Sequence, residues 1–373
     1  MLLCIATILV NMTRPATSGR MRVPVGLPLQ GGGSWGAYTW GVLDALLASR
    51  TLSIGELSGT SAGAINAAIV ASALAQGSRK RARDKLRGFW LDVAYPVSST
   101  PGGEMWEPVE RAWRESISAW MLSSASSPHQ LNPLGLNPLR TLIERHVDID
   151  ALRSSSAPPL HVTLTNVKTG LPRVVTNEAI TVDVLVASAC LPQLFQAVEI
   201  DGEPYWDGGY SGNPTLWPMI DSRDTHDLIV VQLVPDHVDS APTDATGIRR
   251  RVGEIVFNAS LVAEIQAIRA MRALVPYGES DVGVVDTRLH RIGPPPAALL
   301  TSGSALERSR PWLETLFTAG RSAARRFIAR HGADVGVRET LDIGRVFATH
   351  QRLTIDVPAN EDSFEQRVHP RIR

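Results

Sequence analysis

The sequence predicts an α/β fold in which helices flank a central, mostly parallel sheet. Strand and helix patterns alternate from Val23 to Leu74, which is the order expected when successive strands lie parallel in one sheet. A second observation is the run LIVVQLV within Asp227–Val234, because an uninterrupted apolar run is typical of a strand covered on both faces. Both observations place the strands inside the molecule and the helices outside them.

The elements are expected in a definite order along the chain. An apolar segment before a glycine loop predicts the first strand, and apolar residues at three- and four-residue steps predict the helix after it. The first four elements are strand Val23–Leu29, helix Gly36–Ser49, strand Leu52–Ser58 and helix Ala62–Leu74. The later ones are a helix capped by Asn137-Pro138 that runs through Val147, a hairpin of Leu160–Asn166 and Arg173–Thr176, helix Val182–Ala189, strand Asp227–Val234, and helices Arg249–Leu274 and Arg308–His331.

The overall composition narrows the classes of function. The chain has 373 residues, of which 44% are apolar and 20% charged, as in an ordinary globular protein. Lys and Arg together number 37, as do Asp and Glu, so the formal net charge is zero and no basic excess favours nucleic acid. Two cysteines and nine scattered histidines show no metal-ligand spacing, so we expect no metal and no cofactor.

The segment Gly59-Thr60-Ser61-Ala62-Gly63 matches the G-x-S-x-G pattern of a nucleophilic serine. In that arrangement the serine stands on a sharp turn between a strand and a helix, and side chains two residues to either side would collide. The motif follows the apolar segment LSIGELS and precedes AINAAIVASALA, which supply the strand and the helix. The pattern alone is also compatible with an ordinary small-residue turn, but its context favours Ser61 as a nucleophile.

A glycine loop, Gly31-Gly32-Gly33-Ser34-Trp35-Gly36, lies between the first predicted strand and helix. Its spacing satisfies G-x-G-x-x-G, but no acidic residue ends a second strand as a dinucleotide site requires, and the G-K-[ST] of a phosphate loop is absent. Consecutive N–H groups can instead hold the oxyanion of an acyl-transfer intermediate, where each donor lowers the barrier by about 3 kcal/mol. A helix-start loop without a catalytic role is the remaining alternative.

The segment Tyr205-Trp206-Asp207-Gly208-Gly209-Tyr210 offers a partner for the serine. By itself, an Asp-Gly-Gly sequence is most often a tight hairpin turn. Most G-x-S-x-G hydrolases of the α/β type place an acid and then a histidine downstream of the serine. The histidines that are possible by order alone are His226, His237, His290, His331 and His350, and none has a telling local pattern.

Taken together and in this order, the three motifs resemble the patatin family of lipid acyl hydrolases. The matching segments are LQGGGSWGAYTWGVLDAL, SGTSAGAINAA, SACLPQLFQAVEIDGEPYWDGGYSGNP and, weakly, EIVFNASL. The resemblance implies a three-layer fold, a catalytic dyad of Ser61 and Asp207, and no metal or cofactor. It also implies an oxyanion hole from Gly31, Gly32, Gly33 and Ser34, with motif support from Gly36, Gly59, Gly63, Gly208 and Gly209.

The activity implied by the resemblance is hydrolysis of carboxylic esters in phospholipids or related acyl lipids, through an acyl-enzyme on Ser61. The family often has Arg or Lys where this chain has Trp35, which leaves the rate and the preference for anionic head groups open. Three alternatives remain: a soluble esterase, thioesterase or acyltransferase; a non-catalytic lipid- or protein-binding module; and a nucleotide-binding protein that uses the glycine loop.

The expected organisation is one patatin-like domain at residues 23–357. Residues 1–22 are interpreted as a weak targeting segment or a start-site artefact, and residues 358–373 as a charged tail. Residues 96–138 are rich in Ser, Pro, Gly and Asn and predict an irregular or helical cap, whose tryptophans either meet a lipid interface or fill the core. We expect an acyl lipid substrate, peripheral membrane contact and no nucleic acid, with a cytoplasmic or peripheral location, or secretion if residues 1–22 are a signal. No protein partner follows from the sequence.

Overall fold

A single mixed sheet forms the centre of the computed structural model, which describes residues 22–94, 127–220, 222, 225–274, 283–302 and 304–346. Its eight described strands follow the order β5-β6-β3-β2-β1-β7-β8, with β4 paired to β3. They are β1 Val23–Leu29, β2 Leu52–Gly59, β3 Leu160–Asn166, β4 Pro172–Thr176, β5 Val198–Ile200, β6 Glu203–Asp207, β7 Asp227–Val231 and β8 Arg288–Ile292. Strands β3, β2, β1, β7 and β8 run parallel, so the predicted α/β fold with a mostly parallel sheet is confirmed.

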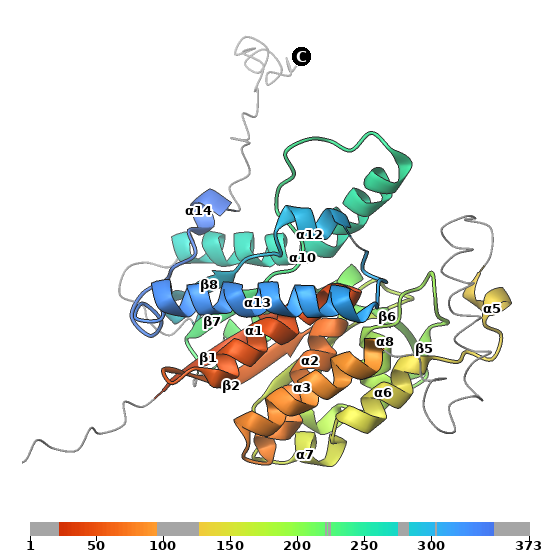
Figure 1. Cartoon of the computed structure of the whole chain (residues 1–373), viewed down its shortest axis with the longest axis horizontal. Helices are drawn as coiled ribbons and strands as arrows, with labels where there is room; N and C mark the ends of the chain where they lie inside the picture. Colours follow the sequence, from red (N-terminus) through yellow and green to blue (C-terminus); the bar gives the residue numbers. More distant parts are fainter. Residues whose placement is uncertain are drawn as a thin grey trace, which may run out of the picture.

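Helices cover both faces of this sheet (Figure 1). The helices are α1 Gly36–Ala48, α2 Ala62–Ala75, α3 Arg79–Ala94, α5 Pro128–Leu131, α6 Pro138–His146, α7 Ile149–Arg153, α8 Val182–Ser188, α9 Trp217–Ile220, α10 Ala245–Leu274, α11 Gly283–Asp286, α12 Ala297–Ser302, α13 Arg310–His331 and α14 Ile343–Val346. Three 3-10 turns join them: η1 Gly33–Trp35, η4 Asn177–Ala179 and η5 Gly208–Tyr210. No helix among the described residues has the length and hydropathy needed to cross a bilayer.

Strand β7 separates two apolar clusters, as its uninterrupted apolar run predicts. All five of its residues are buried. Ile229 and Val231 belong to the large cluster that includes α1, α2, α3 and α13, whereas Leu228 and Val230 pack with Leu261 of α10 and its neighbours. Side chains of successive strand residues point to opposite faces, so this alternation shows that the sheet lies between two helical layers.

The predicted elements agree with the observed ones to within a few residues. Helix α3, strands β5, β6 and β8, and the short helices α7, α9, α11, α12 and α14 were not predicted. Strand β8 has the sequence RLHRI, and its polar residues hide the apolar pattern of a buried strand. The expected segments 1–22 and 358–373, and residues 96–126 of the expected cap, lie outside the described residues, apart from Arg22.

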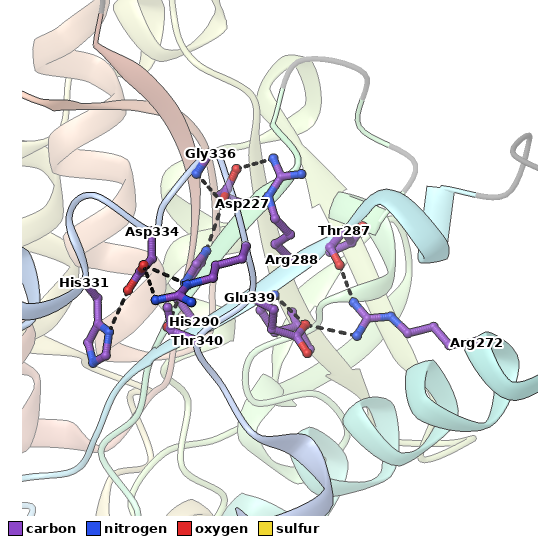
Figure 2. Close-up of polar contacts among 12 residues, drawn as sticks. Asp227, Arg272, Thr287, Arg288, His290, His331, Asp334, Gly336, Glu339 and Thr340 are labelled. Carbon is purple, nitrogen blue, oxygen red and sulfur yellow. Dashed lines mark hydrogen bonds and ion pairs between the residues drawn. The ribbon is translucent and has the colours of Figure 1, made fainter.

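The polar residues of β8 are explained by a buried cluster at the start of β7 and β8 (Figure 2). The carboxylate of Asp227 accepts hydrogen bonds from Arg288 at 3.0 and 2.6 Å and from the Gly336 N–H at 2.8 Å. Its Oδ1 lies 2.9 Å from Nε2 of His290, whose Nδ1 lies 2.8 Å from the Thr340 hydroxyl. Burial alone would raise the pKa of Asp227, but the bonds to His290 and Arg288 outweigh it and lower that pKa. The cluster ties the chain after α13 to the edge of the sheet where its parallel strands begin.

Candidate active site

Ser61 occupies the sharp turn between β2 and α2. This turn lies at the end of the parallel strands opposite to the Asp227 cluster. The φ of 55° and ψ of −126° of Ser61 are unfavourable for a residue with a side chain, and such a conformation persists only where the surroundings enforce it. The flanking glycines permit the turn: a Cβ on Gly59 would lie 2.7 Å from the backbone N of Ala64, and one on Gly63 would lie 2.2 Å from the carbonyl oxygen of Leu29. The G-x-S-x-G spacing is therefore a steric requirement of this turn.

The backbone of the turn is held from a neighbouring segment that the sequence motifs do not reveal. The N–H of Ser61 donates to Oγ of Ser188 at 3.0 Å, and that hydroxyl donates to the carbonyl oxygen of Thr163 at 2.8 Å. The Thr60 hydroxyl donates to the carbonyl oxygen of Gly212 at 2.6 Å. Ser188 ends α8 and Thr163 lies in β3, so two further elements fix the position of Ser61.

Asp207 is the last residue of β6, which pairs with β3. Its Oδ1 accepts a hydrogen bond from the Gly209 N–H at 2.7 Å, and the chain continues as the 3-10 turn η5 instead of reversing in a tight hairpin. A Cβ on Gly208 would lie 2.2 Å from the carbonyl oxygen of Thr163. Gly208 therefore permits a close approach to β3, whereas a Cβ on Gly209 would lie 2.3 Å from the ring of Phe257 in α10.

The carboxyl group of Asp207 is completely buried beside the Ser61 hydroxyl. Burial raises its pKa to about 7, although the Gly209 N–H and the Ser61 hydroxyl both act to lower that pKa. Within the described part of the chain, Oδ2 of Asp207 has no hydrogen-bond partner of normal geometry. The contact with Ser61 is therefore a loose one, as is common for catalytic groups before substrate aligns them.

The glycine loop lies against the turn that holds Ser61. Some of its N–H groups donate to protein acceptors, and others have no acceptor among the described residues. A Cβ on Gly31 would lie 2.7 Å from Cβ of Ser61, which shows how closely the two segments approach. The Gly31 N–H donates to Oδ1 of Asn213 at 2.6 Å, and the Ser34 N–H donates to the carbonyl oxygen of Ala305 at 2.7 Å. Among the described residues, the N–H groups of Gly32 and Gly33 have no protein acceptor.

A third N–H group of the same kind belongs to Ala62, the residue after Ser61. It opens α2 and has no acceptor within the described ranges. Free N–H groups at the start of a helix favour negative charge. The donors available near Ser61 are thus those of Gly32, Gly33 and Ala62, whereas Gly31 and Ser34 use theirs to hold the loop in place.

Two buried amide side chains position the glycine loop, and sequence reasoning did not single them out. Asn213 receives the Gly31 N–H and donates from Nδ2 to the carbonyl oxygen of Phe257 at 2.9 Å. Gln30 donates from Nε2 to the carbonyl oxygen of Asn213 at 3.2 Å, and its Oε1 accepts from the N–H groups after β7, that of Leu233 at 2.7 Å. Both residues lie inside the segments that resemble patatins, but their roles depend on contacts between segments about two hundred positions apart.

Two residues that the sequence analysis singled out, Trp35 and His290, do not contribute side chains to the arrangement around Ser61. The Trp35 side chain is buried in the apolar cluster and does not line the cavity described below, although its neighbour Ser34 does. His290, in the middle of β8, is bound to Asp227 and Thr340 (Figure 2), and strands β1 and β7 lie between β8 and β2, the strand that leads to Ser61. The Asp207 carboxyl group, in contrast, lies beside the Ser61 hydroxyl.

An apolar cavity of about 150 Å³ opens beside Ser61. Its walls come from α2, α3, α6, the segment after α8 and the loop before α13. The apolar side chains among them are Ile65, Phe89, Trp90, Val93, Leu139, Leu142, Leu191, Leu194, Phe195 and Leu306. Ser61 and Ser34 contribute polar groups to this lining, so the cavity combines an apolar interior with a reactive hydroxyl.

Within the ranges that the structure describes, His, Cys, Asp and Glu side chains form no group of three or more that could hold a metal ion. The arrangement offers instead a serine in a strained turn, a buried carboxyl group with a raised pKa and free N–H donors. These are the parts that acyl transfer through a covalent intermediate requires.

The structure is similar to the crystal structure of VipD from Legionella pneumophila, with a TM-score of 0.40 and 15% identity over 82% of this chain and 67% of that chain. The comparison with curated proteins gave no significant match. The family model described as Patatin-like phospholipase matches residues 27–220, which contain Ser61, Asp207 and the glycine loop. That match covers more than half of the sequence, and the chain therefore belongs to the patatin-like phospholipase family.

Proposed function

We propose that this chain is a serine-dependent lipid acyl hydrolase that cleaves carboxylic ester bonds in phospholipids or related acyl lipids. The observation that carries the proposal is the strained Ser61, placed beside the buried Asp207 and at an apolar cavity. Strained backbone at a single polar residue is typical of functional sites. The family match supports the same reaction class.

The first half of the reaction transfers the acyl group to Ser61. The Asp207 carboxylate accepts the proton of the Ser61 hydroxyl as Oγ attacks the ester carbonyl carbon. The N–H groups of Gly32, Gly33 and Ala62 receive the oxyanion that forms. The C–O bond to the alcohol then breaks, and the alkoxide takes the proton from Asp207. The products are a free alcohol and an ester of Ser61.

The second half releases the fatty acid. Water gives a proton to Asp207 as its oxygen attacks the acyl carbon, and the proton returns to Ser61 when the ester bond breaks. An aspartate at its usual pKa of about 3.9 is a weak base for both steps. Burial brings the pKa of Asp207 to about 7, which matches the base to a neutral medium.

The cavity supports a substrate with an apolar chain. Its lining is almost wholly aliphatic and aromatic, and burial of each methylene group of an acyl chain there contributes about 0.8 kcal/mol. The walls begin at Ile65, one turn of α2 beyond Ser61, and extend to Phe89 and Leu142. We therefore place the acyl chain in this cavity and the alcohol portion of the ester outside it.

The test combines active-site labelling with product analysis. Purified wild-type protein and its Ser61→Ala variant are treated with a fluorophosphonate probe, and fatty-acid release is measured from phospholipid and from a short-chain soluble ester. We expect labelling and release in the wild type and neither in the variant. Ser72→Ala is the matched control, because Ser72 is also buried in α2 but its hydroxyl donates to the carbonyl oxygen of Ile69. A folded wild type that neither labels nor hydrolyses would contradict the proposal.

Asp207→Asn separates the base from the rest of the site. The variant keeps an acceptor for the Gly209 N–H but cannot take a proton, so hydrolysis should fall to the level of Ser61→Ala. Normal turnover by Asp207→Asn would refute the dyad even if Ser61 proved to be the nucleophile. Hydrolysis of the short-chain ester without any release from phospholipid would favour a soluble acyl esterase instead.

A further inference from the structure

The outer side of α10 exposes apolar residues along the whole length of this 30-residue helix. Its inner side packs on the sheet through Leu261, Ile265 and Ile268. Of the large side chains facing outward, Val252 is 55% exposed, Ile255 is 54% exposed and Leu274 is 82% exposed. A helix at the surface of a soluble protein normally presents polar residues on its outer side, so this pattern calls for a partner.

The exposed apolar residues form one continuous stripe. They recur at steps of three and four residues, which places them on the same side of the helix. We call this set the outer stripe: Ile248, Val252, Ile255, Val256, Ala259, Ala263, Ala267, Ala270, Met271 and Leu274, all of them exposed. It occupies the side opposite the buried Glu254, Asn258, Leu261, Ile265 and Ile268. The stripe is thus separate from the contacts that hold α10 on the sheet.

Within α10 itself the exposed charges are all positive, and the exposed Asp244 just before the helix accepts from the N–H groups of Thr246 and Gly247. The exposed charged residues of α10 are Arg249 and Arg269, and neither has an ion-pair partner in the described part of the chain. The two acidic residues of the helix are occupied on the inner side: Glu254 pairs with Arg251 at 3.1 Å, and Glu264 accepts from the N–H groups of Leu216 and Trp217. An apolar stripe flanked by arginines without exposed carboxylates is typical of a helix that lies on an anionic lipid surface.

The inner side of the same helix contacts the active-site loops. The ring of Phe257 lies 5.2 Å from that of Tyr210 in η5, centroid to centroid, and its carbonyl oxygen accepts from Asn213, which holds Gly31. The hydroxyl of Ser260 accepts from the N–H of Asn213 at 2.9 Å. Figure 1 shows the first turns of α10 (green) extending beyond the body of the sheet. A surface bound to the outer stripe would therefore lie one helix thickness from the catalytic loops.

We propose that the outer stripe of α10 is the surface through which this protein docks on an anionic lipid interface. The apolar side chains enter the boundary between head groups and acyl chains, and Arg249 and Arg269 contact lipid phosphates. Docking brings the active-site edge of the sheet to the interface that holds the ester. The inference extends the proposed function by naming the surface that meets the lipid, and it is independent of whether Ser61 is the nucleophile.

Charge argues against a second copy of the chain as the occupant. In a two-fold dimer the same patch meets itself, and an antiparallel pair of outer stripes would place arginines on both sides without carboxylates to pair with them. An anionic surface offers those arginines phosphate partners instead. The lipid surface therefore accounts for both the apolar and the charged residues of the stripe.

Vesicle sedimentation tests the inference without interference from hydrolysis. The full-length Ser61→Ala protein is mixed with vesicles of phosphatidylcholine alone or with phosphatidylglycerol added. We expect binding that is stronger to the anionic vesicles and weakens as salt is added. Ile255→Asp should weaken binding by about tenfold or more, because it replaces an inserted apolar side chain with a carboxylate. Leu171→Asp is the matched control, since Leu171 is 64% exposed in the β3–β4 connection and should leave binding unchanged.

Four outcomes decide the matter. Equal thermal unfolding midpoints of the Ile255→Asp and Leu171→Asp variants, with vesicle binding lost in the former, support the inference. Vesicle binding that survives Ile255→Asp overturns it. A dimer in analytical ultracentrifugation that Ile255→Asp converts to monomer, without vesicle binding by either protein, assigns the outer stripe to a second copy instead. If wild-type protein hydrolyses a soluble ester but binds no vesicles, the docking inference fails while the proposed function stands.

Discussion

Replacement of Asp207 by Asn should make the protein more stable at neutral pH while it removes activity. Asp207 is fully buried, and Oδ2 of its carboxyl group has no hydrogen-bond partner among the described residues. Burial raises its pKa from 3.8 to about 7, so the folded protein holds a proton that the unfolded chain releases. Asparagine keeps an acceptor for the Gly209 N–H but carries no charge to be desolvated.

The magnitude and its sign follow from the two pKa values. Below about pH 4 the carboxyl group is protonated in both states, and its contribution to the free energy of unfolding is fully present. As the pH rises toward about 7 the unfolded chain loses the proton first, so the wild type loses stability. The difference between 3.8 and about 7 corresponds to a loss of about 4 kcal/mol, which Asp207→Asn avoids.

Urea unfolding from about pH 4 to about pH 8 measures this effect. The free energy of unfolding of the wild type should fall relative to Asp207→Asn across the acidic range and level off above about pH 7. Glu264 provides a matched control, because burial also raises its pKa to about 7 while it lies outside the dyad. Glu264→Gln should flatten the same pH dependence yet keep hydrolysis. Parallel stability curves for wild type and Asp207→Asn would refute the argument that burial of this carboxyl group stores free energy.

Four further changes test the geometry of the site. Ser61→Gly should raise the free energy of unfolding by about 1–3 kcal/mol, because glycine relieves the strained φ of 55°. Ser61→Ala should not raise it, and thermal unfolding separates the two variants. Gly63→Ala should strongly destabilise the fold, since its Cβ would lie 2.2 Å from the carbonyl oxygen of Leu29, as a shift of the unfolding midpoint would reveal. Asn213→Ala should lower kcat more than it changes KM, because the glycine loop loses its anchor; steady-state ester kinetics report this. The kcat/KM of the wild type should fall about tenfold per pH unit below about pH 7 as Asp207 gains a proton, and a flat profile there would exclude Asp207 as the base.

The Gly63→Ala result has its own control. A Cβ on Gly253 would meet no atom within 4 Å, and this residue lies inside the exposed helix α10. Gly253→Ala should therefore be neutral or stabilising by up to about 1 kcal/mol, because alanine has the higher helix propensity. Equal destabilisation by the two substitutions would show that the contact with Leu29 is not what requires glycine at position 63.

Local patterns in the sequence were sufficient to predict the parallel sheet and the sharp turn that holds Ser61. Strand and helix periodicities depend on residues a few positions apart, and the requirement for Gly59 and Gly63 arises within one turn of chain and the strand beside it. The same reasoning missed β8, because the polar side chains of Arg288 and His290 pair with Asp227 of another strand. A strand that is buried by pairing its polar residues has no apolar signature of its own.

The hydrogen-bond partners and the burial of the site residues, in contrast, depend on the tertiary structure. The sequence by itself determined which residue types stand at Ser61, Asp207 and the glycine loop, and the family resemblance joined them. Only the fold shows that Asn213 and Ala305 accept hydrogen bonds from two of the loop's N–H groups, that those of Gly32 and Gly33 have no acceptor among the described residues, and that Asp207 is buried. The physical reason is that hydrogen-bond partners and burial are set by segments distant in the sequence, which no local pattern encodes.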